Sequence, residues 1–491
     1  MKTQLKDISL NKSNGRIYTP NYIVRIILDE AGYNGEKIIG KHAIDNSCGD
    51  GAFLTEIVKR YCEARQGVAS AEELKGELET FIHGIEIDSE EHEKCVANVS
   101  AVAEGFNIHG VDWDIRCADT LETTDLDGKM DFVLGNPPYV RVHNLADGNF
   151  NKIKQYAFSK NGMTDLFIVF YEIGLKMLNK NGVLGYITPS SFFNSIAGSA
   201  LREHLISNNL IAKIIDLKHF QAFEATTYTT IAILKNNKKN KAITYSEFDE
   251  VNLCPVTIAD DLCPDDIYIA KNFYFASKEN LKRLKRIMFF REDNGFFAVK
   301  NGFATLADKF FIGKFDFSEH VIPIVKASTG KHYTCIFPYD KEGRLIPLAE
   351  LAHDANLQKY YRSNQQNLTM RSLEKASNWH GFGRSQGIND VYKMKYAINT
   401  LLRGTGDIKL TICPPGVGVY SGLYIMTSVP EAELREILYS NEFVNYVSML
   451  SKYKSGGYYT FSSKDLKVYL EYKYAERNGV KNGQCRIFAD A

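Results

Sequence analysis

The sequence predicts an α/β protein whose first half is a doubly wound, mostly parallel sheet. Short apolar runs at residues 42–45, 81–86 and 130–134 read as strands, and helical patterns separate them. A glycine turn at residues 49–51 follows the first run and leads into a helix through Ile57, Val58 and Tyr61. Strands that alternate with helices in this way are typical of parallel sheets with helices on both faces.

Polar side chains stand where these strands end. Asp45, Glu86, Asp119 and Asn136 occupy four strand ends in order along the chain. Ligands of open α/β sheets bind at the carboxyl ends of the strands, and an acidic residue after the second strand is placed to accept ribose hydroxyls. The turn lacks the third glycine of a dinucleotide fingerprint, and no Lys-Ser or Lys-Thr follows it. The series therefore favours a nucleoside cofactor over a dinucleotide or a bound triphosphate.

The segment Gly-Asn-Pro-Pro-Tyr-Val at residues 135–140 is the most informative motif. Pro137 and Pro138 lack N–H donors and fix the backbone, so nearby carbonyls can point outward as acceptors. Asn136 adds a side-chain acceptor and Tyr139 a flat face. Acceptors beside a stacking surface suit a planar group with an exocyclic amine, such as adenine. The alternative is a Pro-Pro turn with a packing tyrosine.

Together with Gly-Arg-Ile-Tyr-Thr-Pro at residues 15–20, this motif resembles the gamma class of adenine-N6 DNA methyltransferases, which includes the Taq I-type modification enzymes. The resemblance covers nearly the whole chain, with the motifs in the family's order. It implies a class I S-adenosylmethionine-dependent methyltransferase domain with a mostly parallel seven-stranded sheet at residues 1–243. It also implies a mixed α+β DNA target-recognition domain at residues 244–491, with double-stranded DNA in the cleft between the two lobes.

The resemblance also assigns roles to individual residues. The expected cofactor is S-adenosyl-L-methionine, with Thr19 and Pro20 at its methionine part, Glu86 at the ribose and Asp119 at its adenine. The complete expected cofactor set is Tyr18, Thr19, Pro20, Asp45, Ser47, Cys48, Gly49, Gly51, Glu86, Ile87, Asp119, Thr120, Asn136 and Pro138. The expected catalytic set is Asn136, Pro137, Pro138, Tyr139 and Phe223.

In this set, Asn136 and the Pro137 carbonyl accept from the N6 amine of a flipped-out target adenine, and Tyr139 stacks on that base. Phe223 is expected on the opposite face, with Phe220 as the second choice, because the loop at residues 220–228 precedes a strand. No metal is expected.

Two segments of the second half suit contacts with DNA. The segment at residues 379–386 contains Arg384, Ser385 and Gln386, and Arg and Gln are side chains that read base edges. The segment at residues 452–461 places Lys454, Tyr458 and Tyr459 around paired glycines, which suits a loop along a nucleic-acid backbone. The alternatives are a glycine loop without a ligand and an aromatic strand after a tight turn. A polar run at residues 235–241 marks the predicted linker.

Composition limits the domain count and the class of protein. A chain of 491 residues predicts two or three domains, and 59 basic against 59 acidic residues neither support nor exclude DNA binding. Nine scattered cysteines without a Cys-x-x-Cys pair indicate reduced thiols and no zinc site. No apolar run reaches the ~18 residues of a membrane span. We therefore expect a cytoplasmic protein without a membrane partner, and the resemblance to restriction-modification methylases implies a bacterial one.

Other functions remain open at this point. The same Asn-Pro-Pro-Tyr motif occurs in enzymes that methylate a protein glutamine amide, and a catalytically silent DNA-binding module is a further alternative. Only fourteen residues precede the Gly-Arg-Ile-Tyr-Thr-Pro motif, so an upstream nuclease domain is not expected. A cognate restriction endonuclease would be encoded separately or be absent, as in an orphan methylase. The protein would act as a monomer or a dimer.

Overall fold

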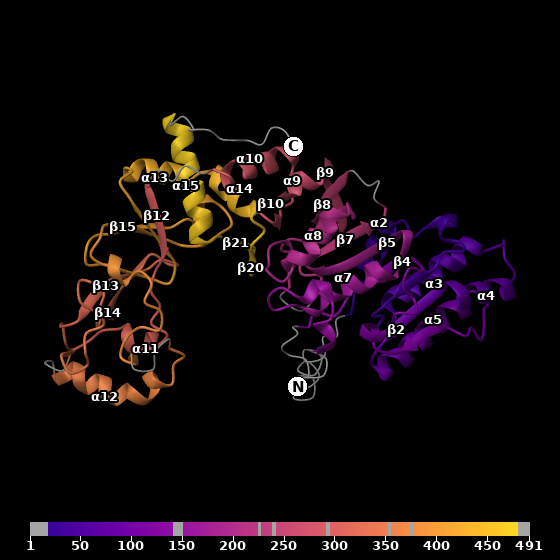
Figure 1. The fold of residues 1–491 in the computed structure, drawn as a ribbon, viewed down its shortest axis with the longest axis horizontal. Helices are drawn as coiled ribbons and strands as arrows, with labels where there is room; N and C mark the ends of the chain where they lie inside the picture. Colours follow the sequence, from indigo (N-terminus) through magenta and orange to yellow (C-terminus); the bar gives the residue numbers. More distant parts are fainter. Residues whose placement is uncertain are drawn as a thin grey trace. The chain divides into compact units, whose positions relative to one another are not determined.

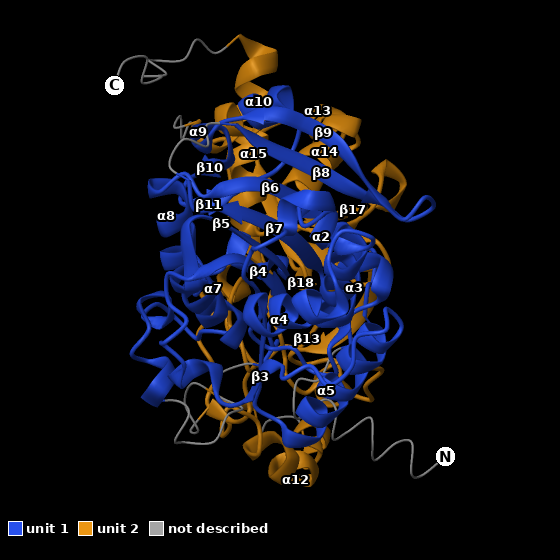
Figure 2. Ribbon diagram, turned by 90° about the vertical axis from the view of Figure 1, so that its right-hand side faces the viewer, with its two compact units in different colours: residues 1–282 blue, residues 283–491 orange. Residues whose placement is uncertain are grey.

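The computed structural model describes residues 18–140, 151–223, 227–237, 242–290, 295–351, 355–373 and 378–479. The chain forms two compact units, residues 1–282 and 283–491 (Figure 2). The first unit is built on one nine-stranded sheet of order β3-β2-β1-β4-β5-β7-β6-β8-β9 (Figure 1). Its strands are β1 (Ala43–Asp45), β2 (Ile82–Glu86), β3 (Asp114–Cys117), β4 (Met130–Gly135), β5 (Leu178–Pro189), β6 (Ile211–Asp216), β7 (Thr229–Lys235), β8 (Ile243–Asp249) and β9 (Cys254–Leu262).

The expected parallel sheet is confirmed. Strands β1 to β5 pair in parallel, and β7 is antiparallel to both β5 and β6. Helices cover both faces: α7 and α8 lie on one side of the sheet and α2 and α3 on the other (Figure 2). The helices of this unit are α2 (Asn21–Ala31), α3 (Ala52–Arg65), α4 (Ala71–Phe81), α5 (Ser89–Glu104), α7 (Leu166–Met177), α8 (Ser199–Ser207), α9 (Pro264–Ile267) and the first part of α10 (Lys278–Met288).

Two further strands lengthen the sheet beyond the seven that were expected. β8 pairs in parallel with β6, and β9 returns antiparallel along β8. The predicted boundary at residue 243 therefore falls at the start of a strand of the same sheet, and the compact unit ends at residue 282. Residues 235–237 of the predicted linker connect β7 to β8, and residues 238–241 lie outside the described residues. Local composition could not show that the next strand, β8, rejoins the same sheet.

The core of the first unit lies between the sheet and the helices. The apolar stripe of α2, which includes Ile23, Val24, Ile27 and Leu28, is fully buried. Gly32 ends this helix in the left-handed conformation, at φ 81°, as is common for C-terminal glycines. α5 begins at Asp88, whose carboxylate accepts from the backbone N–H groups of the first turn. These local signals set where α2 ends and where α5 begins.

The second unit has the mixed α+β architecture that was expected. A four-stranded antiparallel sheet has the order β12-β19-β15-β17, and two three-stranded sheets have the orders β14-β13-β18 and β16-β21-β20. The strands are β12 (Phe297–Asn301), β13 (Val321–Lys326), β14 (Lys331–Ile336), β15 (Lys395–Ile398), β16 (Leu401–Leu402), β17 (Leu410–Cys413), β18 (Gly418–Tyr420), β19 (Leu423–Thr427), β20 (Tyr453–Lys454) and β21 (Tyr458–Thr460). The helices are α11 (Asp308–Phe311), α12 (Ala355–Thr369), α13 (Glu431–Leu438), α14 (Asn441–Met449) and α15 (Ser463–Asn478).

Candidate active site

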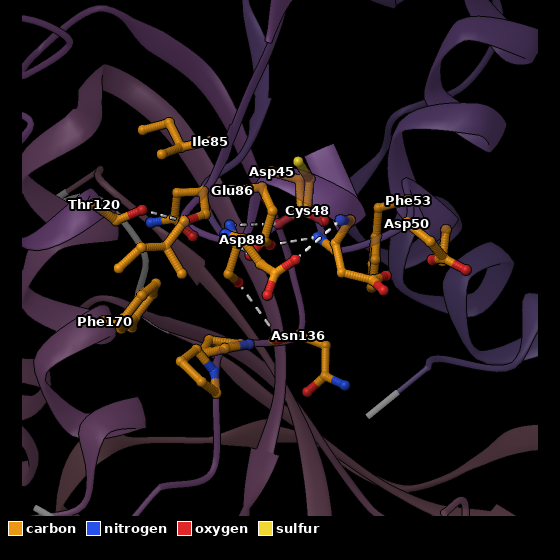
Figure 3. Close-up of a pocket in the computed structure, with 18 of the residues that line it drawn as sticks. Asp45, Cys48, Asp50, Phe53, Ile85, Glu86, Asp88, Thr120, Asn136 and Phe170 are labelled. Carbon is orange, nitrogen blue, oxygen red and sulfur yellow. Dashed lines mark hydrogen bonds between the residues drawn. The ribbon is translucent and has the colours of Figure 1, made fainter. Parts of the chain in front are cut away.

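A pocket of about 390 Å³ opens at the carboxyl ends of β1, β2 and β4 (Figure 3). Its volume lies in the range of small-molecule sites. Most of the predicted cofactor residues line it: Tyr18, Thr19, Asp45, Ser47, Cys48, Gly49, Glu86, Ile87, Asp119, Thr120, Asn136 and Pro138. Pro137 of the predicted catalytic set lines it as well. Parallel strands bring these side chains together because their carboxyl ends meet at one edge of the sheet.

Two predicted cofactor residues, Pro20 and Gly51, are not on the pocket wall. The Pro20 carbonyl accepts from the backbone N–H of Ile23 at 2.9 Å, which starts α2 and places Thr19 at the pocket. Gly51 has φ 92°, a conformation that favours glycine, and an added Cβ would lie 2.9 Å from the Cys95 sulfur. Pro20 and Gly51 therefore support residues of the pocket wall without lining the pocket themselves.

The glycine turn is tied to the neighbouring strand. The backbone N–H of Cys48 donates to the Ile85 carbonyl at 3.0 Å, and the backbone N–H of Gly49 donates to Glu86 Oε2 at 2.8 Å. The other oxygen of Glu86 accepts from the backbone N–H of Asp88 at 2.9 Å. Each carboxylate oxygen has two lone pairs. Glu86 is thus fixed at the pocket and retains acceptor capacity for a bound hydroxyl.

Asp45 is a buried carboxyl at the end of β1. Burial above all, and then the nearby carboxylates of Glu86 and Asp50, raise the pKa of Asp45 to about 8, although a hydrogen bond from the Ser47 backbone N–H opposes this. Gly135 of β4 makes room for it, because a Cβ there would lie 2.5 Å from Asp45 Oδ1. The raised pKa favours the neutral carboxyl, and a cationic ligand beside it would favour its ionised form.

Asp119 already has partners in the protein. Its Oδ1 accepts from the backbone N–H of Leu121 at 3.0 Å, and its Oδ2 forms an ion pair with Lys152 at 3.2 Å. Lys152 also pairs with Glu122 at 2.7 Å. These contacts fix the carboxylate at the mouth of the pocket beside apolar lining residues.

Asn46 lines the pocket and was not predicted as a site residue. Its Oδ1 accepts from the Tyr186 hydroxyl at 2.9 Å, and its carbonyl accepts from the Thr120 hydroxyl at 2.6 Å. All three residues are buried. Asn46 therefore connects the ends of β1, β5 and the turn after β3, and its polar groups are satisfied.

Unlike Asn46, Asn136 has a side-chain amide that is only partly hydrogen-bonded. Its Nδ2 donates to the Thr19 hydroxyl oxygen at 3.0 Å, and its backbone carbonyl accepts from the Ser47 hydroxyl at 3.4 Å. Its Oδ1 is buried and has no hydrogen-bond partner among the residues that the structure describes. Buried polar atoms without partners are uncommon in folded proteins, because each costs about 1–3 kcal/mol. The Asn136 amide therefore holds an acceptor in the pocket that suits an N–H donor of a ligand.

Tyr139 and Phe223, the two aromatics that were expected around one base, are neighbours in the structure. Their ring centroids lie 6.1 Å apart with the planes at 78°. The Tyr139 hydroxyl donates to the Ile187 carbonyl at 3.0 Å, and Phe167 packs edge-on at 6.4 Å. The Tyr139 ring is thus held by contacts on several sides, and Phe223 meets it edge to face.

The second choice for the stacking aromatic, Phe220, is engaged elsewhere. It packs against Phe248 at 4.7 Å and against Tyr22 at 6.5 Å. Of the two candidates, Phe223 is therefore the one whose ring lies beside Tyr139, and its contact with a target base stays a prediction.

Several pocket residues were missed by sequence reasoning. Figure 3 shows Phe170 and Thr120 on one side of the pocket, and Phe53 and Asp50 on the other. The residues missed are Asn46, Asp50, Ala52, Phe53, Ile85, Asp88, Glu91, Leu121, Val140, Leu166 and Phe170. Leu166 and Phe170 are buried, and their apolar pattern at helical spacing is equally typical of a core helix. Their spacing of four on one face of α7 was the available signal.

The predicted DNA-contacting residues lie in the second unit. Arg384, Ser385 and Gln386 are exposed, and buried Phe382 anchors their loop by stacking on Phe303 at 4.6 Å. Among the described residues, the Arg384 guanidinium has no hydrogen-bond or ion-pair partner. This loop presents polar side chains outward from a fixed base.

The other predicted segment is a β-hairpin. Lys454 of β20 faces Tyr458 of β21, and Tyr459 pairs with Tyr453. The guanidinium of Arg403 lies over the Tyr458 ring at 4.4 Å. The aromatic strand after a tight turn, which was the alternative interpretation, is therefore present, and Lys454 is exposed on it.

Comparisons with known proteins agree with this geometry. Residues 58–223 match the family model described as Eco57I restriction-modification methylase, and this segment contains the whole 135–140 motif. The resemblance to restriction-modification methylases is confirmed. The Type II methyltransferase M.BstVI of Geobacillus stearothermophilus is 28% identical over 422 residues, which cover 74% of this chain and 73% of that protein. The Type II methyltransferase M.PaeR7I of Pseudomonas aeruginosa is 24% identical over 407 residues, covering 75% and 70%.

The fold is also shared with a larger enzyme. A structure of the Type IIL restriction-modification enzyme MmeI in complex with DNA matches 90% of this chain with a TM-score of 0.63 and 15% sequence identity. The match spans 64% of the MmeI chain. The α/β fold expected for a class I S-adenosylmethionine-dependent methyltransferase is thereby confirmed, and the fold together with the matched family model implies S-adenosyl-L-methionine as the cofactor.

The pocket residues fit this cofactor. The Glu86 carboxylate is available to hydroxyl groups, and the buried Asp45 carboxyl would be ionised by a cationic ligand such as a sulfonium with an ammonium group. No group of three or more His, Cys, Asp or Glu side chains that suits a metal ion occurs in the part of the chain that the structure describes. Within the same residues, no helix is both long enough and apolar enough to cross a membrane.

Proposed function

We propose that the protein transfers a methyl group from S-adenosylmethionine to the N6 amine of an adenine in a specific duplex DNA sequence. The observation that supports this most directly concerns Asn136, which lines the pocket with Pro137 and whose buried Oδ1 has no hydrogen-bond partner within the described part of the chain. An exocyclic amine supplies the N–H donor that this acceptor lacks.

The chemistry asks little of titratable groups. When bound, the cofactor supplies a methyl group that its sulfonium charge already activates. Held by Glu86 and the other residues that line the pocket, the cofactor would supply this methyl group to the lone pair of the adenine N6. Positive charge develops on N6, and Asn136 Oδ1 stabilises it by accepting one N6 hydrogen. The surplus proton leaves N6 for solvent after transfer, so no general base is needed.

The position of Asn136 is fixed before the substrate arrives. Thr19 accepts from its amide nitrogen, and Ser47 donates to its backbone carbonyl. An acceptor held in this way loses little entropy at the moment of reaction, which favours the aligned geometry. Tyr139, whose hydroxyl donates to the Ile187 carbonyl, offers its ring face to an extruded base.

We further propose that residues 283–491 recognise the DNA sequence. The exposed loop with Arg384, Ser385 and Gln386 and the hairpin with Lys454, Tyr458 and Tyr459 are the candidate contacts. The relatives named Type II methyltransferases suggest a modification enzyme of a restriction-modification system, with a separately encoded endonuclease or none. A DNA substrate places the protein in the bacterial cytoplasm, where it would act as a monomer or a dimer.

The test uses the purified full-length protein, unmethylated genomic DNA and cofactor with a labelled methyl group. DNA digested to nucleosides and analysed by mass spectrometry should contain labelled N6-methyldeoxyadenosine, and the Asn136→Ala protein should leave it unlabelled. A label on cytosine would contradict the base assignment. Unlabelled DNA together with a label on glutamine of an added protein extract would contradict DNA as the substrate and favour amide methylation.

A further inference from the structure

We propose that Met163 and Ile196 form an apolar wedge that enters the DNA duplex beside the target base and stabilises its extruded state. This inference rests on the proposed function. Met163 is 77% exposed and Ile196 is 76% exposed, so both apolar side chains project into solvent. They belong to two loops of the first unit, at residues 160–164 and 192–198.

The loop that carries Ile196 is rigidly held from below. Arg202 of α8 is buried, and its Nη1 donates to the carbonyls of Phe192 at 2.7 Å and Ser195 at 2.8 Å. Its Nε donates to the carbonyl of Lys271 at 2.8 Å. The Arg202 guanidinium donates to three backbone carbonyls and so fixes the loop, because breaking these hydrogen bonds would leave a buried charge without partners. The exposed Ile196 is therefore displayed by a well-supported loop.

The two loops are also joined to each other. The Asn161 amide nitrogen donates to the Ser199 hydroxyl oxygen at 3.0 Å, and that hydroxyl donates to the Ile196 carbonyl at 2.8 Å. The backbone at Gly162 lies against Ile196, since a Cβ added at Gly162 would be 3.3 Å from Ile196 Cγ2. Met163 is the next residue along, so the two apolar side chains project from a single joined feature.

The wedge stands at the edge of the sheet where the target base would enter. β4 and β5 are parallel, and Gly135, directly before the Asn136 motif, pairs with Tyr186. β5 continues to Pro189, from which the chain passes into the Ile196 loop. On the other side, the backbone N–H of Leu166 donates to the Val140 carbonyl at 2.9 Å, which ties the segment after Met163 to the end of the motif.

The free-energy cost of base extrusion explains why an apolar wedge would be useful. Extrusion costs a few kcal/mol, and stacking on one aromatic ring returns about 1–3 kcal/mol. Phe223 meets Tyr139 edge to face, so the structure offers the base one stacking face and not a preformed slot between two parallel rings. An apolar side chain inserted at the vacated step would supply the remaining stabilisation, as apolar wedges do in proteins that unstack DNA.

A basic residue stands at the same loop. Lys160 is exposed and has no ion-pair partner among the residues that the structure describes. An ammonium group three residues from Met163 would attract the phosphates that flank an inserted side chain. The chemistry of this feature, an apolar tip beside a cation, therefore fits a nucleic-acid duplex better than an apolar protein surface.

The test compares the wild-type protein with a Met163→Ser/Ile196→Ser double variant on duplexes that contain the methylated site. In one duplex, 2-aminopurine replaces the target adenine and reports extrusion by its fluorescence. In two others the target adenine faces either thymine or an abasic site, and single-turnover methylation is measured on both. Val251→Ser is the matched control, because Val251 is 88% exposed at the β8–β9 turn.

We expect the double variant to lose most of the 2-aminopurine signal and about tenfold or more of its rate on the paired duplex, since tenfold corresponds to a modest part of the extrusion cost. On the abasic duplex its rate should return to near the wild-type rate. The control should match the wild type on both, and the melting temperatures of all three proteins should agree. A variant with wild-type fluorescence and rate, or an equal loss on both duplexes, would overturn the wedge. A wild-type protein that methylates no duplex would overturn the proposed function and the wedge with it.

Discussion

Replacing Asn136 by alanine should separate activity from stability, because its two amide atoms have opposite roles. In the cofactor-free protein the buried Oδ1 has no partner, so its removal relieves about 1–3 kcal/mol of desolvation. The bond from Nδ2 to Thr19 is lost at the same time, which costs about 0.5–1.5 kcal/mol. The difference between these two ranges runs from about −0.5 to about +2.5 kcal/mol, so the free energy of unfolding should be nearly unchanged or should rise.

Methyl transfer should respond very differently. A preorganised hydrogen-bonding group that faces developing charge contributes about 10²–10³-fold to the rate. We therefore expect the Asn136→Ala protein to lose at least about 100-fold in single-turnover methylation. Urea denaturation of the cofactor-free protein supplies the stability, and labelled-methyl transfer to DNA supplies the rate.

Asn46 provides the matched control, since it is an asparagine on the same pocket wall whose amide oxygen is satisfied. In the Asn46→Ala protein the buried Tyr186 hydroxyl loses its acceptor, and the free energy of unfolding should fall by about 1–3 kcal/mol or more. The reasoning would be refuted if Asn136→Ala destabilised the protein as much as Asn46→Ala does. It would equally be refuted if Asn136→Ala kept the wild-type rate.

Three further predictions concern the cofactor and DNA. Glu86→Ala should weaken cofactor binding at least about tenfold without changing DNA affinity, because charge-assisted hydrogen bonds are lost and the glycine turn loses its contact at Gly49. Unchanged cofactor affinity in calorimetry would contradict the contact between Glu86 and the ribose. Asp45 has its pKa raised from 3.8 to about 8 in the folded protein, so its contribution to stability is fully present below pH 4 and is lost as the pH rises through 8. The cofactor-free protein should therefore be more stable to urea at pH 6 than at pH 8.5, and Asp45→Asn should flatten that dependence; an equal slope in both proteins would contradict it. Arg384→Ala should cost about 1–3 kcal/mol of binding to the recognised site while cofactor affinity stays the same, and unaltered site affinity would exclude Arg384 from base contact.

The pocket was largely predictable because its residues lie at strand ends. Asp45, Glu86 and Asn136 stand at the ends of short apolar runs, and parallel pairing of the strands brings these ends and the turn with Asp119 to one edge. The sequence order of the motifs thus translates directly into a shared pocket wall.

The apolar part of the pocket was not predictable in the same way. Leu166 and Phe170 face the pocket from α7, a helix that is buried almost all round. An apolar residue at helical spacing gives the same signal whether it packs against the core or lines a cavity, so periodicity alone could not separate the two. The end of the first unit was missed for a related reason, since the pairing of β8 with β6 joins segments that are distant in sequence.

The unsatisfied state of Asn136 also needed three-dimensional information. The motif identified Asn136 as an acceptor, but its contact with Thr19 connects residues that are 117 positions apart. Only the folded chain shows that one amide atom is held by the protein while the other is left for a ligand. This difference between the two amide atoms supports the role proposed for Asn136 in methyl transfer.

The central claim is methyl transfer to adenine N6 in a specific DNA sequence, and single-molecule methylation mapping tests it most directly. Genomic DNA would be sequenced from a methylation-free host that expresses either the wild-type protein or the Asn136→Ala protein. The account predicts one N6-methyladenine sequence motif that is present with the wild type and absent with the variant. Genomic DNA without any new mark, from cells in which the wild-type protein is folded and binds its cofactor, would contradict it.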